Sequence, residues 1–415
     1  MNNYNIITLG PSGAGKTVFL ASLFKSLSIQ GEHGFFLEVE DNKKQTFLNK
    51  IYTEVISGET WPRGTMRGEV TEWVFTCCVK TQDLSKHPAC KFTYFDYAGG
   101  LLTDLDPDEE DDLNFDFQKA VEQADAVLAI LDGLRVLQFM EDQNLSNKGV
   151  MKWMQSDLPN IMQLIDDCKK ETPVHFIISK WDLVENKYPL LEVRNRLLEK
   201  VPEFRKVVRS RTAAGCPVRL IPISSIGMSF ATLQTDGEMK KLSGAIPHPF
   251  QVEVPLACVL IDGLKAQVSK LKEEQEKILQ RPTEVKPKYG IFGKVDQLLS
   301  NTVLSVTATV IRQFLLANLP QKYKINNFAL QRFIDLTEKG VETVEGKIQR
   351  TQKEAARIQE QAAQETEKLR QQQEQSLKVV KDEETALDHA INSFLFIQNK
   401  LITNFPASDL GGSGL

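Results

Sequence analysis

Apolar and polar residues alternate in two different ways along the chain, and the change comes near residue 280. Before it, short runs rich in β-branched and aromatic residues are separated by longer stretches whose apolar residues recur every three or four positions. The runs predict strands and the longer stretches predict helices. The predicted strands are Asn5–Leu9, Glu69–Lys80, Cys90–Tyr97, Ala126–Asp132 and Val218–Ser224, and the predicted helices are Val18–Ile29, Lys43–Ile56, Lys148–Cys168 and Val254–Leu279.

This order of elements predicts an α/β domain over residues 1–280. Glu69–Lys80 and Cys90–Tyr97 flank a turn signal, so we expect them to form a β-hairpin. The continuous apolar run Ala126–Asp132 suits a central parallel strand. The expected sheet is therefore mostly parallel, with one antiparallel hairpin strand.

Residues 281–405 show helical patterns without the strand-like runs of the first part of the chain. Pro282 and Pro287 end the preceding helix, and residues 281–327 form a connector with an apolar stretch at Tyr289–Leu319. That stretch predicts a buried helix or, alternatively, a tip that touches a membrane or a partner. Residues 328–405 lack proline and are dominated by Gln, Glu, Lys, Arg and Ala, which predicts a helical or coiled-coil region of one or two helices. Helices this polar usually pair, either antiparallel or with another chain.

The last part of the chain is more apolar again. The density of apolar residues rises from Leu387 to Phe405, which predicts docking onto Val295–Leu319. Residues 406–415 end in a glycine-rich run and predict a disordered tail.

Composition narrows the class of protein. With 415 residues, 41% of them hydrophobic, the chain can form two or three domains. A net charge of −5 disfavours nucleic acid as a partner. The six cysteines show no CxxC pairing, so we expect reduced core thiols. The chain begins a strand without a leader and has no apolar run of spanning length, which predicts a cytoplasmic protein.

The first chemical motif joins the first strand to the first helix. Gly10, Gly15, Lys16 and Thr17 fill the pattern GxxxxGKT of a phosphate-binding loop. Glycines let backbone amides approach the phosphates, Lys16 can neutralise phosphate charge, and the Thr17 hydroxyl is an expected Mg²⁺ ligand. The predicted nucleotide-binding residues of this loop are Gly10, Ser12, Gly13, Ala14, Gly15, Lys16, Thr17 and Val18.

The hairpin ends in a second motif, FDYAGG, in which Asp96 and Gly99 form a DxxG. Following a phosphate-binding loop by one hairpin, Asp96 is the expected carboxylate of the metal site and Gly99 the expected sensor of the γ-phosphate. The acidic run Asp104–Asp112 follows. It predicts a solvated switch loop, with a calcium loop as the alternative, although the EF-hand glycine and glutamate are missing.

A third motif is typical of guanine recognition. Ser179, Lys180 and Asp182 fit [N/T/S]KxD, in which the aspartate accepts hydrogen bonds from guanine N1 and N2, a pair that adenine cannot supply. The last strand ends in Ser224, Ser225 and Ile226, whose amides can receive the guanine carbonyl, although so short a signal also fits a plain turn.

Taken in this order, the motifs resemble P-loop GTPases of the translation-factor and Ras-like class over Met1–Gln280, and most closely the bacterial stand-alone double-GTPase type. The resemblance implies a Ras-like G domain that binds GTP or GDP with Mg²⁺. It also implies that Thr65, with Thr60 as the alternative, closes over Mg²⁺ and the γ-phosphate and acts with Lys16 and Gly99 in catalysis.

Three departures from this class bear on activity. Ser12 stands where many small GTPases have glycine, and Ser179 replaces the commoner asparagine. Gly100 follows the DxxG, where a glutamine often orients the attacking water, so we expect slow hydrolysis without a partner or self-association.

The function expected from these features is a GTP-hydrolysing switch whose nucleotide state is transmitted to a C-terminal helical arm. One alternative is a dynamin-like mechanoenzyme with peripheral membrane contact. Another is a nucleotide-bound scaffold with little turnover. The expected partner is a second copy of the chain or another protein, bound through the C-terminal helices.

Overall fold

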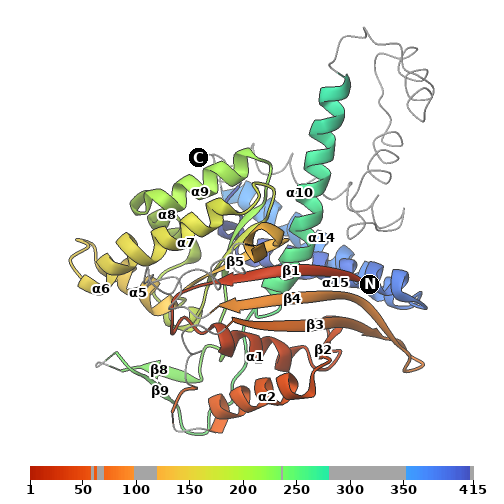
Figure 1. The fold of residues 1–415 in the computed structure, drawn as a ribbon, viewed down its shortest axis with the longest axis horizontal. Coiled ribbons are helices and arrows are strands. Elements are labelled where there is room, and N and C mark those ends of the chain that lie inside the picture. Colours follow the sequence, from red (N-terminus) through yellow and green to blue (C-terminus); the bar gives the residue numbers. More distant parts are fainter. Residues whose placement is uncertain (58–59, 63–69, 98–118, 235–236, 280–351, 412–415) are drawn as a thin grey trace.

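The computed structural model describes residues 1–57, 60–62, 70–97, 119–234, 237–279 and 352–411. Its centre is a seven-stranded sheet in the order β2-β3-β4-β1-β5-β6-β7 (Figure 1). The strands are β1 Asn2–Leu9, β2 Phe36–Val39, β3 Val70–Lys80, β4 Lys86–Tyr97, β5 Ala126–Leu131, β6 Val174–Ile178 and β7 Val218–Pro222. β3 runs antiparallel to both of its neighbours, whereas β1, β4, β5, β6 and β7 pair in parallel. The predicted sheet with one antiparallel hairpin strand is confirmed.

The central strands are buried on both faces. In β5 every residue is buried, and successive residues alternate between two clusters, with Ala126, Leu128 and Ile130 in one and Val127, Ala129 and Leu131 in the other. Side chains of a strand point alternately to its two faces, so each cluster fills one side of the sheet.

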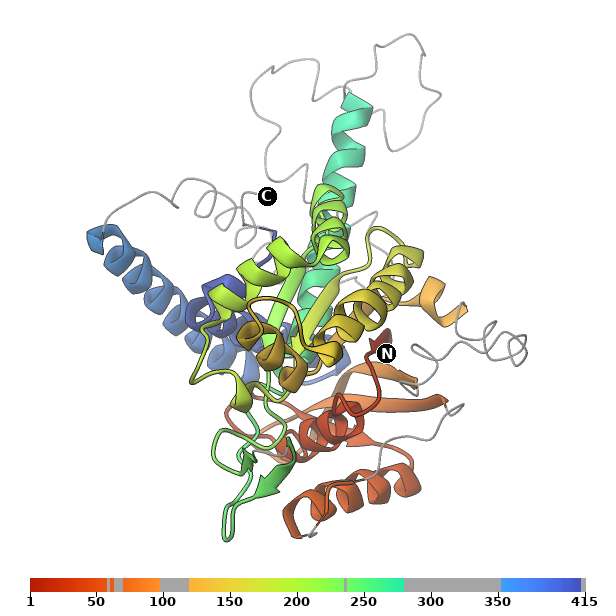
Figure 2. The same ribbon diagram turned by 90° about the vertical axis from the view of Figure 1, so that its left-hand side faces the viewer.

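Helices cover both faces of the sheet (Figures 1 and 2). The first cluster contains residues of α1 Lys16–Ser26, α2 Asn42–Ser57 and α10 Val254–Leu279. The second contains residues of α5 Gly133–Glu141, α6 Lys148–Lys152, α7 Leu158–Asp167, α8 Leu190–Lys200 and α9 Pro202–Ala213. A π-helical turn, Trp153–Asp157, joins α6 to α7. A short hairpin of β8 Ala231–Leu233 and β9 Met239–Lys241 stands apart from the main sheet.

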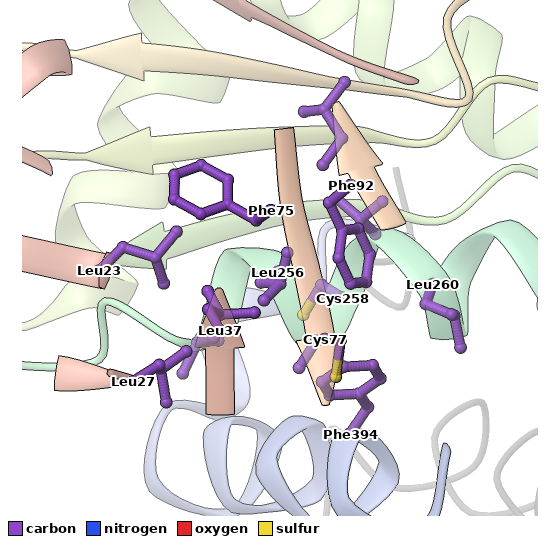
Figure 3. Close-up of a cluster of buried hydrophobic side chains, with 14 of the residues drawn as sticks. Leu23, Leu27, Leu37, Phe75, Cys77, Phe92, Leu256, Cys258, Leu260 and Phe394 are labelled. Atoms are coloured by element: carbon purple, nitrogen blue, oxygen red, sulfur yellow. The ribbon is translucent and has the colours of Figure 1, made fainter. Parts of the chain in front are cut away.

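The described C-terminal residues 352–411 contain two α-helices, α14 Gln352–Leu377 and α15 Glu383–Asn404, separated by five residues. Asp382 caps the N-terminus of α15 in a capping box with Thr385. α15 lies against the sheet, where Phe394 contacts Phe92 edge to face at a ring-centroid distance of 6.1 Å (Figure 3). Phe394 also contacts Phe35 edge to face, at 4.8 Å. The prediction that residues 328–405 form a region separate from residues 1–280 is therefore wrong for α15, which completes the core of the nucleotide domain. The apolar stretch 289–319 and the connector 281–327 lie outside the described residues.

The end of the chain also departs from expectation. Pro406–Ser408 form a 3-10 turn, and Ala407 and Leu410 are buried in the second cluster. The Leu410 amide donates to the Val218 carbonyl at 3.0 Å, at the edge of the sheet. The prediction of a disordered tail is wrong for residues 406–411, because these residues bury apolar side chains and pair with β7.

All six cysteines are buried and free, as predicted. Among the helices that the structure describes, none combines the length and apolar content needed to cross a membrane.

Candidate functional site

The phosphate-binding loop connects β1 to α1. Gly13 and Gly15 adopt positive φ angles of 79° and 87°, a conformation that a residue with a Cβ rarely takes. α1 begins at Lys16, and Gly15 at its N-cap offers no side chain to its first amides. Amides at a helix N-terminus without a side-chain partner can bind an anion, so the loop has the geometry of a phosphate cradle.

The Lys16 side chain lies inside this loop. It is buried, and its Nζ donates to the carbonyl oxygens of Gly10 at 2.8 Å and Pro11 at 3.2 Å. Burial lowers the Lys16 pKa, and the charge of Asp96 opposes this shift. The ammonium is therefore desolvated and held by neutral carbonyls, an environment in which phosphate oxygens would be stronger partners. Within the same loop Ala14 is buried, while Ser12 and Gly13 are exposed.

Asp96 lies next to the loop, on β4, in register with Thr8 of β1. The side chain is 1% exposed. Desolvation raises its pKa to about 6, against the opposing effects of Lys16 and of a hydrogen bond with the Thr17 side chain. Within the described part of the chain, Asp96 Oδ1 has no hydrogen-bond partner.

This donor set fits Mg²⁺. A buried carboxylate oxygen without a partner, beside a threonine hydroxyl, offers the oxygen ligands that Mg²⁺ prefers. Among the residues described, no group of three or more His, Cys, Asp or Glu side chains could hold a metal ion. Mg²⁺ at nucleotide sites is typically held by one or two carboxylates with phosphate oxygens and water, so the protein ligands are Thr17 and Asp96 if the ion binds here.

The predicted base-reading residues lie beside the loop. Lys180 has a positive φ of 49°, and its Nζ donates to the Gly13 carbonyl at 2.9 Å. The same Nζ pairs with Asp132 at 2.9 Å. The lysine thus bridges the base-reading motif to the phosphate-binding loop.

Asp182 lies at the junction of two predicted base-binding segments. Its Oδ1 accepts a hydrogen bond from Ser224 Oγ at 2.6 Å. Desolvation raises the Asp182 pKa, and the Ser224 hydrogen bond opposes the shift. Ser225 is tied to α1, because its carbonyl accepts from Ser22 Oγ at 2.8 Å. Ile226 is buried in a small cluster on which Val18 also packs.

The structure thus brings the predicted site residues together at the carboxyl ends of the parallel strands. They are residues 10–18, Asp96, Lys180, Asp182 and 224–226. The carboxyl ends of parallel strands are where α/β folds place their ligands. Thr65, Gly99, Gly100 and the acidic run 104–112 lie outside the described residues, so their predicted roles stay predictions.

Sequence reasoning missed Asp132 and Gly133. Asp132 caps α5 through the Leu134 amide, at 3.1 Å, and also holds Lys180. A Cβ on Gly133 would lie 2.0 Å from the Ser179 carbonyl oxygen, so a larger residue would displace the base-reading segment. The signal was an Asp-Gly pair directly after a fully buried strand.

Comparison with known proteins gives one family match. The family model described as Double-GTPase 1 matches residues 7–246, more than half of the chain. A search of curated proteins found no match.

Solved structures give weaker likenesses. The signal recognition particle receptor SRb-GTP/SRX complex from Chaetomium thermophilum has 17% identity and a TM-score of 0.32, covering 55% of this chain and 92% of that one. Methanosarcina barkeri Roco2 RocCORdC bound to GDP has 14% identity and a TM-score of 0.24, covering 81% and 66%. Sup35 complexed with GDP has 12% identity and a TM-score of 0.27, covering 54% and 37%.

The family match covers the phosphate-binding loop, Asp96, Asp182 and Ser224, that is, every segment assembled at the edge of the sheet. The chain belongs to the Double-GTPase 1 family and carries a P-loop G domain that binds and hydrolyses GTP.

Proposed function

We propose that this G domain is a slow, Mg²⁺-dependent GTP switch whose nucleotide state is transmitted to the C-terminal helices. The observation that carries the proposal is the contact of Lys180 Nζ with the Gly13 carbonyl, at 2.9 Å. It joins the base-reading segment to the phosphate-binding loop, so that one nucleotide spans both.

The phosphate end is assigned to residues 10–18. Lys16 exchanges its contacts with the carbonyls of Gly10 and Pro11 for contacts with the β- and γ-phosphate oxygens. The exchange is favourable because a charge-assisted hydrogen bond between two ions is stronger than one to a neutral carbonyl. The amides of Gly13 to Val18 surround the phosphates at the start of α1.

Thr17 and Asp96 would hold Mg²⁺. The ion would neutralise charge that develops on the phosphates during transfer. The support is the buried Asp96 Oδ1, which has no hydrogen-bond partner among the described residues, and the raised pKa of Asp96. A cation would relieve both. By the resemblance, Thr65 and Gly99 would respond to the γ-phosphate.

The base end is assigned to Asp182 and its neighbours. The Asp182 carboxylate accepts from guanine N1 and N2, and Ser224 Oγ holds that carboxylate in place at 2.6 Å. The amides of Ser225 and Ile226 face the guanine carbonyl, and Lys180 packs along the base.

Slow turnover follows from Gly100, which has no side chain to orient an attacking water. Positioning of the reacting groups supplies much of the rate acceleration in phosphoryl transfer. Without a side chain that orients the attacking water, GTP therefore stays bound and unhydrolysed for long periods. A second copy or another protein would supply the missing group.

Transmission to the helices is supported by contacts on the loop between α1 and β2. His389 Nε2 of α15 donates to the Gly34 carbonyl at 2.9 Å. Gln373 Nε2 of α14 donates to the His33 carbonyl at 2.8 Å. Since α1 begins at Lys16, a shift of this helix on nucleotide exchange moves a loop that both C-terminal helices hold.

The decisive experiment exchanges the base. Asp182→Asn converts an acceptor into a side chain that can donate to the 2-oxo group of xanthine. We expect the variant to prefer xanthine nucleotides, measured as the ratio of dissociation constants for xanthosine and guanosine diphosphate.

Lys16→Ala serves as the companion variant in this experiment. It should abolish binding of both diphosphates while the chain stays folded by circular dichroism, because the lysine holds phosphate charge. Unchanged guanine preference in Asp182→Asn would show that this motif does not read the base.

A further inference from the structure

Residues 227–234 and 237–247 leave the proposed base loop 224–226 and return to it, and we call them the excursion. The Ser224 amide donates to the Phe250 carbonyl at 3.1 Å, and the Phe250 amide donates back at 2.7 Å. The His248 amide donates to the Ile226 carbonyl at 3.1 Å. Between these anchors the chain forms β8 and β9 (Figure 1). A force on the excursion therefore acts directly on the base loop.

The end of β9 holds the last turn of α2 and the segment that follows it. Lys241 Nζ donates to the carbonyls of Glu54 at 3.0 Å and Thr60 at 3.1 Å. It also lies 4.8 Å from the centre of the Trp61 ring, within the range of a cation–π interaction. Trp61 Nε1 in turn donates to the Met239 carbonyl at 2.7 Å. We call this reciprocal contact between Trp61 and Lys241 the clamp.

The clamp shares an apolar cluster with the base loop. Val55, Ile226 and Phe230 are buried together, and Val18 and Trp61 pack on them. The rings of Trp61 and Phe230 meet edge to face at 6.4 Å. Ile226 is thus held between α1, the end of α2 and the clamp.

We propose that Trp61 and Lys241 are positioning residues of the guanine site, and that the clamp slows nucleotide release by fixing the base loop. The inference rests on the proposed function, which assigns residues 224–226 to the base. Without the Lys241 ammonium, two carbonyls lose a charged donor and Trp61 loses its cation. The packing of Trp61 in the apolar cluster that contains Ile226 then becomes less fixed. The base loop becomes more mobile as a result, and this loop carries Ser224, the hydrogen-bond partner of Asp182.

The experiment measures release of fluorescent guanosine diphosphate from the full chain. Lys241→Met keeps the length of the side chain and removes its charge, and the neighbouring exposed residue supplies the matched control, Lys240→Met. We expect Lys241→Met to speed release about tenfold, because the bonds lost involve a charged donor. Lys241→Arg should restore slow release, and Lys240→Met should leave it unchanged.

A second ligand distinguishes a specific effect on the base loop from a general loss of structure at the nucleotide site. Inorganic pyrophosphate contacts only the phosphate-binding loop, so its dissociation constant should stay within about twofold in Lys241→Met. Trp61→Phe should also speed release, and the double variant should show less than the product of the two effects, because both changes open one contact.

Three results would overturn the inference. The first is release from Lys241→Met that is as slow as from Lys240→Met, and the second is a loss of pyrophosphate affinity in Lys241→Met equal to its loss of diphosphate affinity. The third is a double variant whose release rate equals the product of the effects of Lys241→Met and Trp61→Phe. If Lys241→Met does not fold, Lys241→Gln is judged by the same measurements. The proposed function is tested by a different measurement, the base preference of Asp182→Asn. If the proposed function is wrong, that variant keeps its preference for guanine, and this result does not depend on the clamp.

Discussion

Lys16 and Asp96 are buried neighbours whose pKa values move toward each other. Burial lowers the pKa of the lysine and raises that of the aspartate to about 6, while their mutual attraction opposes both shifts. Neither charge is well solvated in the free protein. A ligand that brings phosphate oxygens to Lys16 and a cation to Asp96 stabilises both charged forms, so binding and protonation are linked at this site.

We predict that binding of magnesium-loaded guanosine diphosphate weakens in mild acid. Because the Asp96 pKa is raised to about 6, the carboxyl is ionised above that pH and neutral below it, and a neutral carboxyl does not ligate Mg²⁺. Affinity should therefore be present above pH 6 and fall about tenfold between pH 7 and pH 5, the change in the ionised fraction for such a group. Calorimetric titration across this range measures it.

Asp96→Asn provides the control for this measurement. The titration of the nucleotide phosphates contributes in both proteins, so the variant should show only that weaker pH dependence. An identical pH profile for the two proteins would mean that Asp96 does not contact the cation.

Single residues were predictable from sequence where their chemistry is encoded locally. Lys16 and Asp182 belong to short motifs whose spacing fixes their surroundings, and the structure brings them to the same edge of the sheet. Asp132 and Lys241 carry no such spacing. Lys241 contacts carbonyls that lie more than 180 residues earlier in the chain, a pairing that depends on the whole fold.

At the scale of elements, α15 shows that apolar density can predict a docked helix without giving the surface on which it docks. Its buried face carries His389, Ser393 and Gln398 as well as Phe394. Each polar group has a partner: His389 donates to Gly34, Ser393 accepts from Gln373, and Gln398 donates to Asp262 at 3.0 Å. Buried polar groups are tolerated when they are hydrogen-bonded, so the apolar residues of α15 alone understate how much of the helix is covered.

We predict that Phe394→Ala strongly destabilises the nucleotide domain. The ring is fully buried against Phe35 and Phe92, so its removal leaves a cavity between α15 and the sheet. The free energy of unfolding should fall by about 3–5 kcal/mol, the usual cost of truncating a buried phenylalanine. Urea unfolding followed by circular dichroism measures it.

A matched change in the same hairpin tests the specificity of this loss. Val379→Ala lies between α14 and α15, where the side chain is 63% exposed, and it should change stability by less than about 0.5 kcal/mol. Equal effects of the two substitutions would contradict the packing of α15 on the sheet.

Across the whole molecule, the end of the chain closes the fold. Gln398 of α15 joins a buried group in which Arg219 of β7 pairs with Asp262 of α10. Burial by itself would raise the Asp262 pKa, but Arg219 and Lys265 hold it well below its usual range. Removing one member would leave a buried charge uncompensated. A chain ending near Gln280 would lack α15 and Gln398, so we expect it to be unstable, and activity should be measured on the full chain.

Turnover of the full chain should depend on contacts between copies. With α15 in the core, α14 is the helix of the C-terminal hairpin that keeps a polar outward face, including Gln364, Glu367 and Lys368. We expect the dilute protein to hydrolyse GTP on the order of 10⁻³ s⁻¹ or slower, as G domains do when no partner supplies a positioning group. Turnover per molecule should rise with protein concentration as copies associate through this face, because a group supplied in trans can accelerate phosphoryl transfer by about 10³–10⁵.

Phosphate release measured against protein concentration, with sedimentation at the same concentrations, provides the test. Asp96→Ala should lower the rate at every concentration without changing association, since that carboxylate is assigned to the metal and not to the contact between copies. Fast hydrolysis independent of concentration would show that every catalytic group is already present in one chain. A slow rate that stays flat while the copies associate would instead rule out self-association as the activating step. In either case the contact through α14 would have no part in catalysis, because a group acting in trans must change the rate when its partner binds.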